Sequence, residues 1–211
     1  MGPKPLYGEL MAVVTEFSSG VPDVPAERRE GLDKLVSLLR ARRDVGEPID
    51  LVFICTHNSR RSHVAQIWAQ TAAYFHGMET VRTWSGGTEA TAFAPPAIAS
   101  VHRHGFRVEK GAGRDNPHVL VRYAPDAPLL DCWSKVYDDP ANPRSGFIAV
   151  MVCSSADEAC PFVAGAAERV SLPYRDPKES DGSEREAAVY DERVREIGRE
   201  VFSVFARVVG G

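Results

Sequence analysis

The sequence predicts an α/β domain in which helices flank an open parallel sheet of four strands. Two patterns predict this class. Short apolar runs of strand length alternate with stretches in which apolar residues recur at helical spacing, and this alternation is typical of right-handed strand–helix–strand units. The run at 147–153 is apolar throughout, as expected of a parallel strand that is buried on both faces.

Residues 1–48 are expected to form a helical extension ahead of this domain. Apolar residues recur at helical spacing from Leu6 to Phe17, and serine, glycine and proline residues at 18–25 then interrupt the pattern. A second amphipathic stretch covers about 27–43. Its polar face is basic and is expected to be solvated. This face carries Arg28, Arg29, Lys34, Arg40, Arg42 and Arg43.

Residues 49–211 are expected to form the α/β domain itself. Residues 107–145 are less regular than the rest and are interpreted as an insertion, in which 118–123 and 129–133 pair as a β-hairpin. The other elements expected, in chain order, are a strand at 49–54, a helix at 62–76, a strand at 81–85, a helix at 95–104, strands at 146–153 and 168–172, and a helix at 184–208.

Composition and charge exclude several classes of protein. The 25 basic and 29 acidic residues give a net charge of −4, which argues against a nucleic-acid binder or a polybasic membrane anchor. The apolar run at 147–153 is far shorter than the roughly 20 residues that span a bilayer. The N-terminus lacks the apolar core of a signal peptide. We therefore expect a cytoplasmic protein that binds neither nucleic acid nor a membrane, in which the four cysteines serve packing, metal binding or redox chemistry.

The segment C-T-H-N-S-R-R-S, at 55–62, is the strongest candidate for a functional site. Cys55 stands at the carboxyl end of a predicted buried strand, and Arg61 follows six positions later at the start of a helix. With this spacing, several backbone N–H groups can point into one anion-binding cradle at a helix N-terminus. The helix dipole and Arg61 favour the thiolate form of Cys55. The Arg61 guanidinium can also grip two oxygens of a tetrahedral oxyanion.

The remaining residues of this segment complete the candidate loop. Ser62 can donate a hydrogen bond to the thiolate, and asparagine at position 58 tolerates a left-handed turn. The expected oxyanion-binding loop consists of Thr56, His57, Asn58, Ser59, Arg60 and Ser62.

This loop resembles the active-site loop of the low-molecular-weight tyrosine phosphatase superfamily, which includes the thioredoxin-coupled arsenate reductases. The segment W-S-G-G-T-E, at 84–89, is similar to the one that follows the second strand in both branches. The resemblance covers about residues 49–208, apart from most of 107–145. It implies a four-stranded parallel sheet between helices, a nucleophilic Cys55, and arsenate or phosphate as the bound oxyanion.

The segment L-P-Y-R-D-P-K, at 172–178, matches the family's Asp-Pro loop. The match implies that Asp176 is the general acid that protonates the leaving oxygen. The residues alone leave a second interpretation open, because Asp-Pro commonly opens a turn. Lys178 departs from the phosphatase branch, which often has a tyrosine there that can pack on a phenyl ring.

Cys153 and Cys160 are seven positions apart in C-S-S-A-D-E-A-C-P, a spacing that is poor for zinc. The stretch is similar to the redox segment of thioredoxin-coupled arsenate reductases. The resemblance implies that both cysteines form a relay with Cys55, which thioredoxin or another thiol reductant resets. Such a relay requires a mobile loop or a helix that can unwind. As alternatives, the pair could be small buried residues, and Cys132, which is expected in the core, could replace one of them.

The leading hypothesis is a cytoplasmic arsenate reductase. The second is a phosphatase that hydrolyses phosphotyrosine or a small phosphomonoester through a Cys55 phosphocysteine, and the third is a non-enzymatic regulator that binds an oxyanion. No cofactor and no metal are expected. Asn58 and Ser85 match a potassium site of some arsenate reductases, but Gln66 stands where an acid is typical.

Overall fold

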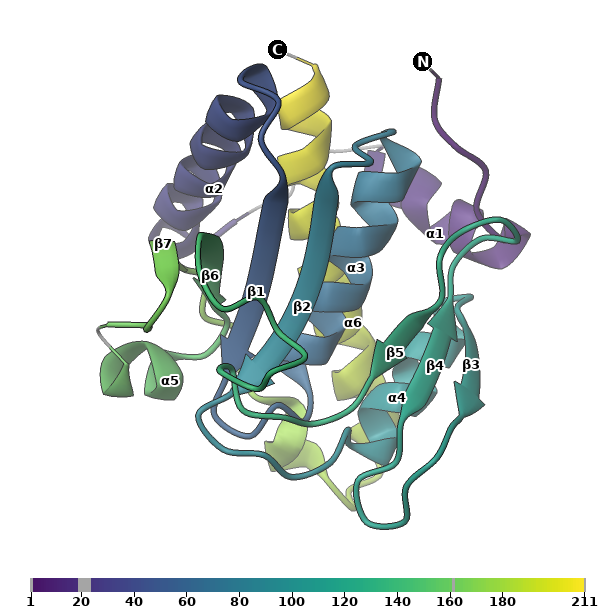
Figure 1. The fold of residues 1–211 in the computed structure, drawn as a ribbon. Helices are drawn as coiled ribbons and strands as arrows, with labels where there is room; N and C mark the ends of the chain where they lie inside the picture. Colours follow the sequence, from purple (N-terminus) through teal and green to yellow (C-terminus); the bar gives the residue numbers. More distant parts are fainter. Residues whose placement is uncertain (1, 19–23, 161, 211) are drawn as a thin grey trace.

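The computed structural model describes residues 2–18, 24–160 and 162–210, so part of the predicted break at 18–25 and Pro161 lie outside the described residues. Its main sheet confirms the predicted architecture (Figure 1). Four parallel strands lie in the order β2-β1-β6-β7, with the bounds Ile49–Cys55 for β1, Val81–Gly87 for β2, Phe147–Met151 for β6 and Ala166–Ser171 for β7. Because β1 and β6 are neighbours, the segments that follow their carboxyl ends meet at one edge of the sheet, where open α/β sheets bind ligands.

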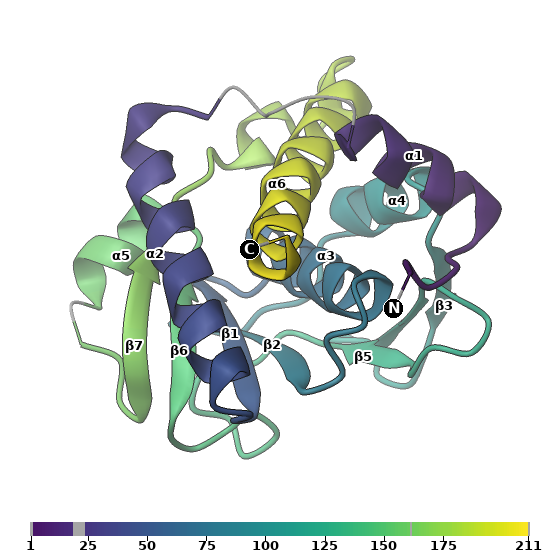
Figure 2. The ribbon, with the colours of Figure 1, turned by 90° about the horizontal axis from the view of Figure 1, so that it is seen from above.

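Helices α2 (Ala26–Asp44), α3 (Arg61–Phe75) and α6 (Glu186–Val209) form a layer on one face of this sheet, and α1 (Gly8–Ser18) packs on α6 (Figure 2). The short helix α5 (Ser154–Ala159) lies at the other face. Successive side chains of a strand point to opposite faces. On β7, Glu168 pairs with Lys34 of α2, whereas the next residue, Arg169, pairs with Asp157 of α5.

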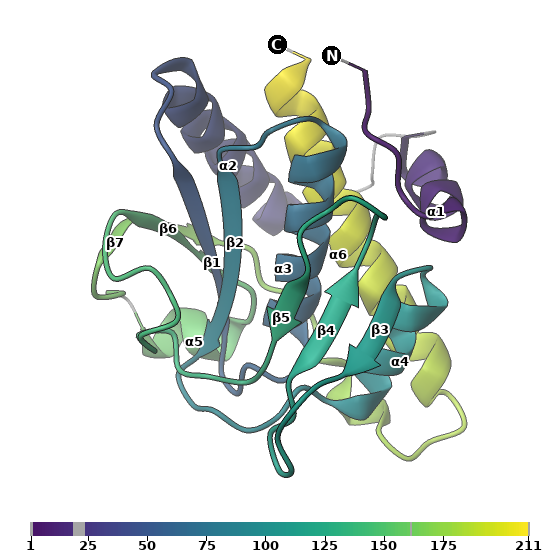
Figure 3. The same cartoon turned by 45° about the vertical axis from the view of Figure 1, so that its right-hand side comes forward.

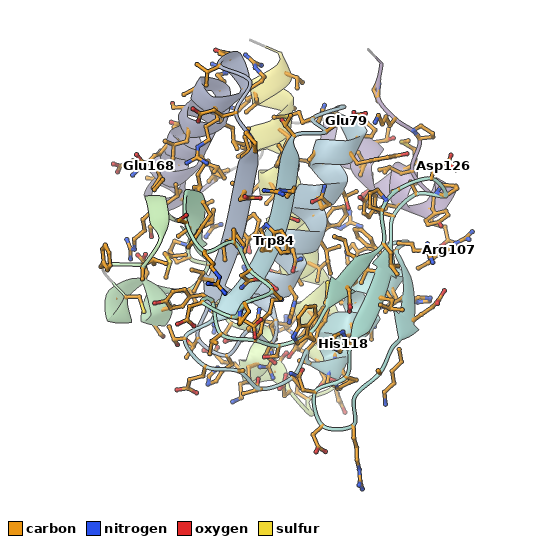
Figure 4. All side chains as sticks on the ribbon, viewed as in Figure 1. Glu79, Trp84, Arg107, His118, Asp126 and Glu168 are labelled. Carbon is orange, nitrogen blue, oxygen red and sulfur yellow. The ribbon has the colours of Figure 1, made fainter. Side chains whose placement is uncertain are left out.

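The face opposite α2, α3 and α6 is partly open. Figure 4 shows Trp84 of β2 on this face. Its indole N–H donates to Asp50 of β1 at 3.3 Å, and Asp50 also pairs with Arg82. Polar side chains of β1 and β2 therefore pair with one another on this face.

Trp68 of α3 joins the N-terminal helix α1 to the core of the α/β domain. Its fully buried ring packs edge-on against Phe17 of α1 at 5.3 Å and against Phe202 of α6 at 5.7 Å. Gly198 allows this close approach, because a Cβ at that position would lie 2.6 Å from the Trp68 ring. The extension and the domain thus share one continuous hydrophobic core.

A small antiparallel sheet lies beside the main one (Figure 3). It contains the predicted hairpin, formed by β4 (Val119–Arg122) and β5 (Leu130–Cys132), and a third strand, β3 (Arg107–Lys110), that the sequence did not indicate. Three of the four residues of β3 are charged, so it lacks an apolar pattern. Helix α4 (Pro95–Arg103) packs between this sheet and α6, and a short 3-10 helix, η1 (Pro177–Ser180), precedes α6.

One expectation about the extension is wrong. The basic face of α2 is not solvated throughout, because Arg28 is 7% exposed and pairs with Glu200 of α6. The helical pattern alone cannot show which arginine meets carboxylates from a distant helix. No helix within the described residues has the length and apolar character needed to cross a membrane.

Candidate active site

The loop between β1 and α3 turns its carbonyl groups outward. The carbonyl oxygens of residues 55–57 and 59 accept hydrogen bonds from the segment 88–94 and from Ser134, at 2.8–3.1 Å. In a trans peptide the C=O and the next N–H point in opposite directions, so the corresponding N–H groups turn inward. Within the described part of the chain, no N–H of residues 56–60 donates to another group. Free amides at the start of a helix form a cradle suited to an anion.

Gly87, at the end of β2, brings segment 88–94 close to the loop. A Cβ at this position would lie 2.6 Å from the Thr56 carbonyl oxygen and 2.8 Å from the Asn58 nitrogen. Gly87, the second glycine of W-S-G-G-T-E, is therefore required because the backbone of the loop lies too close for a side chain. This close approach allows segment 88–94 to bond the outward carbonyls of the loop.

Asn58 and Ser62 form a hydrogen-bonded chain that ends at the Cys55 thiol. Asn58 has the predicted left-handed backbone, with φ 42°, and its Oδ1 accepts the Lys135 N–H at 2.8 Å. Its Nδ2 donates to Ser62 Oγ at 2.8 Å. The Ser62 hydroxyl is therefore free to donate its hydrogen to Cys55 Sγ, 3.1 Å away. The chain of hydrogen bonds therefore fixes the Ser62 hydroxyl beside the Cys55 sulfur.

Arg61 is held by the segment that carries Asp176. Its Nη1 donates to the Tyr174 carbonyl oxygen at 2.9 Å, and its Nη2 donates to the Asp176 carboxylate. Arg61 Nε is buried and has no hydrogen-bond partner among the described residues. A buried N–H without a partner costs free energy. An oxyanion bound in the neighbouring cradle could accept a hydrogen bond from this N–H and remove that cost.

Cys153 lies beside the loop, at the N-terminus of α5. Its side chain is fully buried, and its Sγ lies 3.5 Å from the Thr56 hydroxyl and 3.3 Å from the Ala156 N–H. Cys160 is the C-terminal cap of the same helix and is partly exposed. The six residues of α5 rise about 9 Å, whereas the Cα atoms of a disulfide lie within about 7 Å. A bond between Cys153 and Cys160 therefore requires α5 to unwind.

Arg169 of β7 holds α5 in its helical form. Its guanidinium donates to the carboxylate and the carbonyl of Asp157 and to the Cys160 carbonyl, the last at 3.1 Å. The Ser171 hydroxyl donates to the other carboxylate oxygen of Asp157 at 2.7 Å. Release of these contacts would have to accompany any unwinding of α5.

Two side chains of the predicted oxyanion-binding loop point elsewhere. Arg60 donates to the Tyr190 hydroxyl at 2.6 Å and to the Asp181 carboxylate at 2.8 Å. The His57 ring is half-exposed, with its Nε2 3.7 Å from a Glu89 carboxylate oxygen. These residues can therefore contribute to oxyanion binding through their backbone amides.

The residues that match a potassium site are bonded to protein groups. Asn58 Oδ1 accepts from Lys135, and Ser85 Oγ is 3.1 Å from His63 Nδ1. Lys135 is itself buried, and its positive charge helps to lower the pKa of His63. This environment does not fit a bound cation. No group of three or more histidine, cysteine or acidic side chains suited to a metal occurs in the described part of the chain.

His63, next to Ser62, provides a test of the packing behind the loop. Burial lowers its pKa to about 3, and its ring stacks on Phe93 with 4.2 Å between the centroids. Unfolding returns the pKa to about 6.5, so below that pH the unfolded chain binds the extra proton. Acidification from pH 7 to pH 5 should therefore lower the free energy of unfolding by about 2 kcal/mol through this residue.

This contribution should disappear in His63→Gln, as measured by urea unfolding at both pH values. The remaining pH dependence belongs in part to His76 and His104, because burial also lowers their pKa values. An identical pH dependence in the wild type and in His63→Gln would contradict a neutral buried ring.

Cys132 lies in β5, within the small sheet, and is fully buried. Burial raises its pKa to about 12. The thiol therefore stays protonated at neutral pH, as in an ordinary core cysteine, and is a poor candidate for thiolate exchange.

Three residues that shape the site were not indicated by the sequence. Ser134 and Lys135 bond the loop from the insertion, and Tyr174 holds Arg61 through its carbonyl oxygen. Two of these contacts use backbone atoms, which leave no signal in residue identity. Ser134 lies 77 positions from the carbonyl that it contacts.

Comparison with known proteins gives curated relatives and solved structures of similar fold, although no protein-family model matches the chain. An arsenate reductase from Bacillus licheniformis is 24% identical over 153 residues, which cover 72% of this chain and 91% of the relative. An arsenate reductase from Bacillus subtilis is 26% identical over 149 residues, which cover 70% and 88%. Among solved structures, a YwlE arginine phosphatase with a phosphorylated active-site serine has a TM-score of 0.50 at 15% identity, covering 76% of this chain and 96% of its own. The last likeness concerns the fold alone.

Proposed function

We propose that the chain belongs to the superfamily of low-molecular-weight tyrosine phosphatases and arsenate reductases, and that it reduces arsenate to arsenite through a cysteine relay. The observation that carries the proposal is that Cys153 lies next to the oxyanion loop. Its sulfur contacts Thr56 of the oxyanion loop, and a second cysteine, Cys160, lies at the far end of the same short helix. Hydrolysis of a phosphate ester would not need this pair.

In the first step, the Cys55 thiolate attacks arsenate that is held by the loop amides and Arg61. A sulfur–arsenic bond forms, and the leaving oxygen departs as water after Asp176 supplies a proton. Arg61 Nη2 and Asp176 are bonded to each other in the structure. When Arg61 turns this donor to the oxyanion, the Asp176 carboxyl group is released from the pair.

In the second step, the Cys153 thiolate attacks Cys55 Sγ. The new S–S bond takes the place of the S–As bond, whose electron pair stays on arsenic, so arsenite leaves and two thiols supply the two electrons. Cys160 then attacks Cys153 and releases the Cys55 thiolate. A dithiol reductant of the thioredoxin type reduces the Cys153–Cys160 disulfide, a reaction suited to a reducing compartment such as the cytoplasm.

A coupled assay tests this function directly. Arsenate added to the protein with thioredoxin, thioredoxin reductase and NADPH should drive steady oxidation of NADPH. Steady turnover of an aryl phosphate without arsenate-dependent NADPH oxidation would favour the phosphatase instead. Tight phosphate binding without either reaction would favour an oxyanion-binding regulator.

Arg61→Lys is expected to lower kcat/KM for arsenate by a factor on the order of 10² to 10³, the usual cost of losing a donor to a developing anion. Lysine keeps the charge but cannot donate from Nε, Nη1 and Nη2 in one plane. The contact with the Tyr174 carbonyl should also weaken. Initial rates over a range of arsenate concentrations check this result. A rate within twofold of the wild type would mean that charge alone suffices.

Asp176→Asn is expected to slow the chemical step by about 10² to 10⁴-fold, as for other general acids, while phosphate binding stays nearly intact. Asparagine cannot supply the proton, but it also removes the carboxylate that pairs with Arg61. Single-turnover rates and equilibrium binding of inorganic phosphate separate the two effects. An unchanged single-turnover rate would assign the acid to another group.

A further inference from the structure

Helix α2 lies against the chain segment that leads to the proposed general acid (Figure 2). The contact is close at Gly31, where a Cβ would lie 2.1 Å from the Ser171 carbonyl oxygen and 2.8 Å from Leu172 Cδ2. Lys34, one turn later, donates to the Arg169 carbonyl at 2.9 Å. This helix precedes the residues that carry the family motifs, so the superfamily resemblance gives it no role.

Arg28, in the first turn of α2, is the centre of a buried cluster of charges. Its guanidinium lies 2.9 Å from Glu200 and 2.5 Å from Glu196, both on α6. Glu200 is 2% exposed, and Arg193 of α6 pairs with Glu196. The cluster thus contains two cations and two carboxylates. Removing one cation would leave a buried carboxylate uncompensated.

The cluster meets the active site at Tyr174. The Arg28 guanidinium lies over the Tyr174 ring, 5.1 Å from its centroid. Burial and the neighbouring Glu200 carboxylate raise the pKa of Tyr174, so the ring remains a neutral phenol. The carbonyl oxygen of the same residue accepts the hydrogen bond from Arg61 Nη1, and Asp176, two residues later, pairs with Nη2. Arg28 of α2 thus contacts the Tyr174 ring, and the segment that carries Tyr174 and Asp176 contacts Arg61.

We propose that Arg28 is a positioning residue for the oxyanion site: through the Tyr174 ring it fixes the segment 172–176, and with it the orientation of Arg61 and Asp176. The inference deepens the proposed function and rests on it for the roles of those two residues. It gives helix α2 a part in catalysis through contacts made behind the oxyanion site. A small displacement of catalytic groups is enough to slow a reaction by up to about 100-fold.

Hydrogen exchange tests the positioning without reference to any reaction. The Leu172 and Tyr174 amides donate to the Met151 and Val152 carbonyls at 2.8 and 3.2 Å, so their exchange reports opening of this segment. Arg28→Met should speed exchange at both amides at least about tenfold, and Arg28→Lys should do so less. The matched control is Arg40→Met on the same helix, because Arg40 donates to the Arg207 carbonyl in the C-terminal turn of α6. It should leave both amides unchanged.

Kinetics separate positioning from a general loss of stability. Below the unfolding temperature, Arg28→Met should lower kcat about tenfold and weaken phosphate binding, whereas Arg40→Met should change neither. In the Asp176→Asn background the same change should cost a smaller factor, because the group that it positions is already gone. Equal factors in both backgrounds, or unchanged exchange at Leu172 and Tyr174, would overturn the proposal. If the wild type shows no arsenate reduction, the proposed function fails, while the exchange experiment still decides the positioning.

Discussion

Replacing Cys55 with serine is expected to abolish arsenate reduction and any phosphatase activity together, by a factor on the order of 10⁴ or more. Both proposed reactions would begin with attack by the same sulfur, which is buried and lies 3.1 Å from the Ser62 hydroxyl. A serine hydroxyl at neutral pH is a far weaker nucleophile than a thiolate. The coupled NADPH assay and hydrolysis of an aryl phosphate measure the two activities.

The cradle itself should survive this change. The outward carbonyls of the loop and the hydrogen bonds of Asn58 do not involve the thiol, so Cys55→Ser should still bind inorganic phosphate. Cys132→Ala is the matched control, since it removes a buried thiol from the small sheet and should keep both activities. Retention of either activity in Cys55→Ser would refute the role of Cys55. Loss of both activities in Cys132→Ala would show that the assays report folding rather than chemistry.

The cradle could be predicted because its signal is local. Cys55, Asn58 and Ser62 lie within eight residues at the junction of a strand and a helix, and hydrogen bonds join their side chains in the structure. The parallel sheet was predicted for a similar reason. A buried strand such as β6 is apolar along its whole length, so its pattern identifies it without knowledge of its neighbours.

The supports of the cradle could not be predicted, because they join distant parts of the chain. Arg28 and Glu200 are 172 positions apart, and a basic helical face shows nothing of the buried carboxylate that one of its members meets. The strand β3 was missed because it is an exposed edge, paired on one side only and rich in charge. Helix α5 was one of two conformations compatible with the cysteine spacing, and contacts from Arg169 and Ser171 of another strand stabilise it.

The relay predicts different outcomes for its two later cysteines. Cys160→Ser should reduce one equivalent of arsenate and then stop, because Cys153 can still attack Cys55 and release arsenite, but no third thiol then resolves the Cys55–Cys153 disulfide. A Cys55–Cys153 disulfide should then be detectable by mass spectrometry. Cys153→Ser should form no such bond and release no arsenite. Neither change touches the loop amides or Arg61, so any aryl phosphatase activity of the wild type should persist in both variants.

The relay requires two movements of the structure, the unwinding of α5 and the release of its contacts with Arg169. Cys153 is buried at the N-terminus of α5, and Cys160 can reach it only if the helix unwinds and Arg169 releases Asp157 and the Cys160 carbonyl. Arsenate should therefore speed hydrogen exchange across 154–160 more in the wild type than in Cys160→Ala. Only the wild type can form the Cys153–Cys160 disulfide, which requires α5 to unwind. Multiple turnovers of arsenate reduction by the double variant Cys153→Ser/Cys160→Ser, in the presence of thioredoxin, would eliminate the relay. In that case an external thiol would have to attack the Cys55 adduct directly, and the contact between Cys153 and Thr56 would be a matter of packing alone.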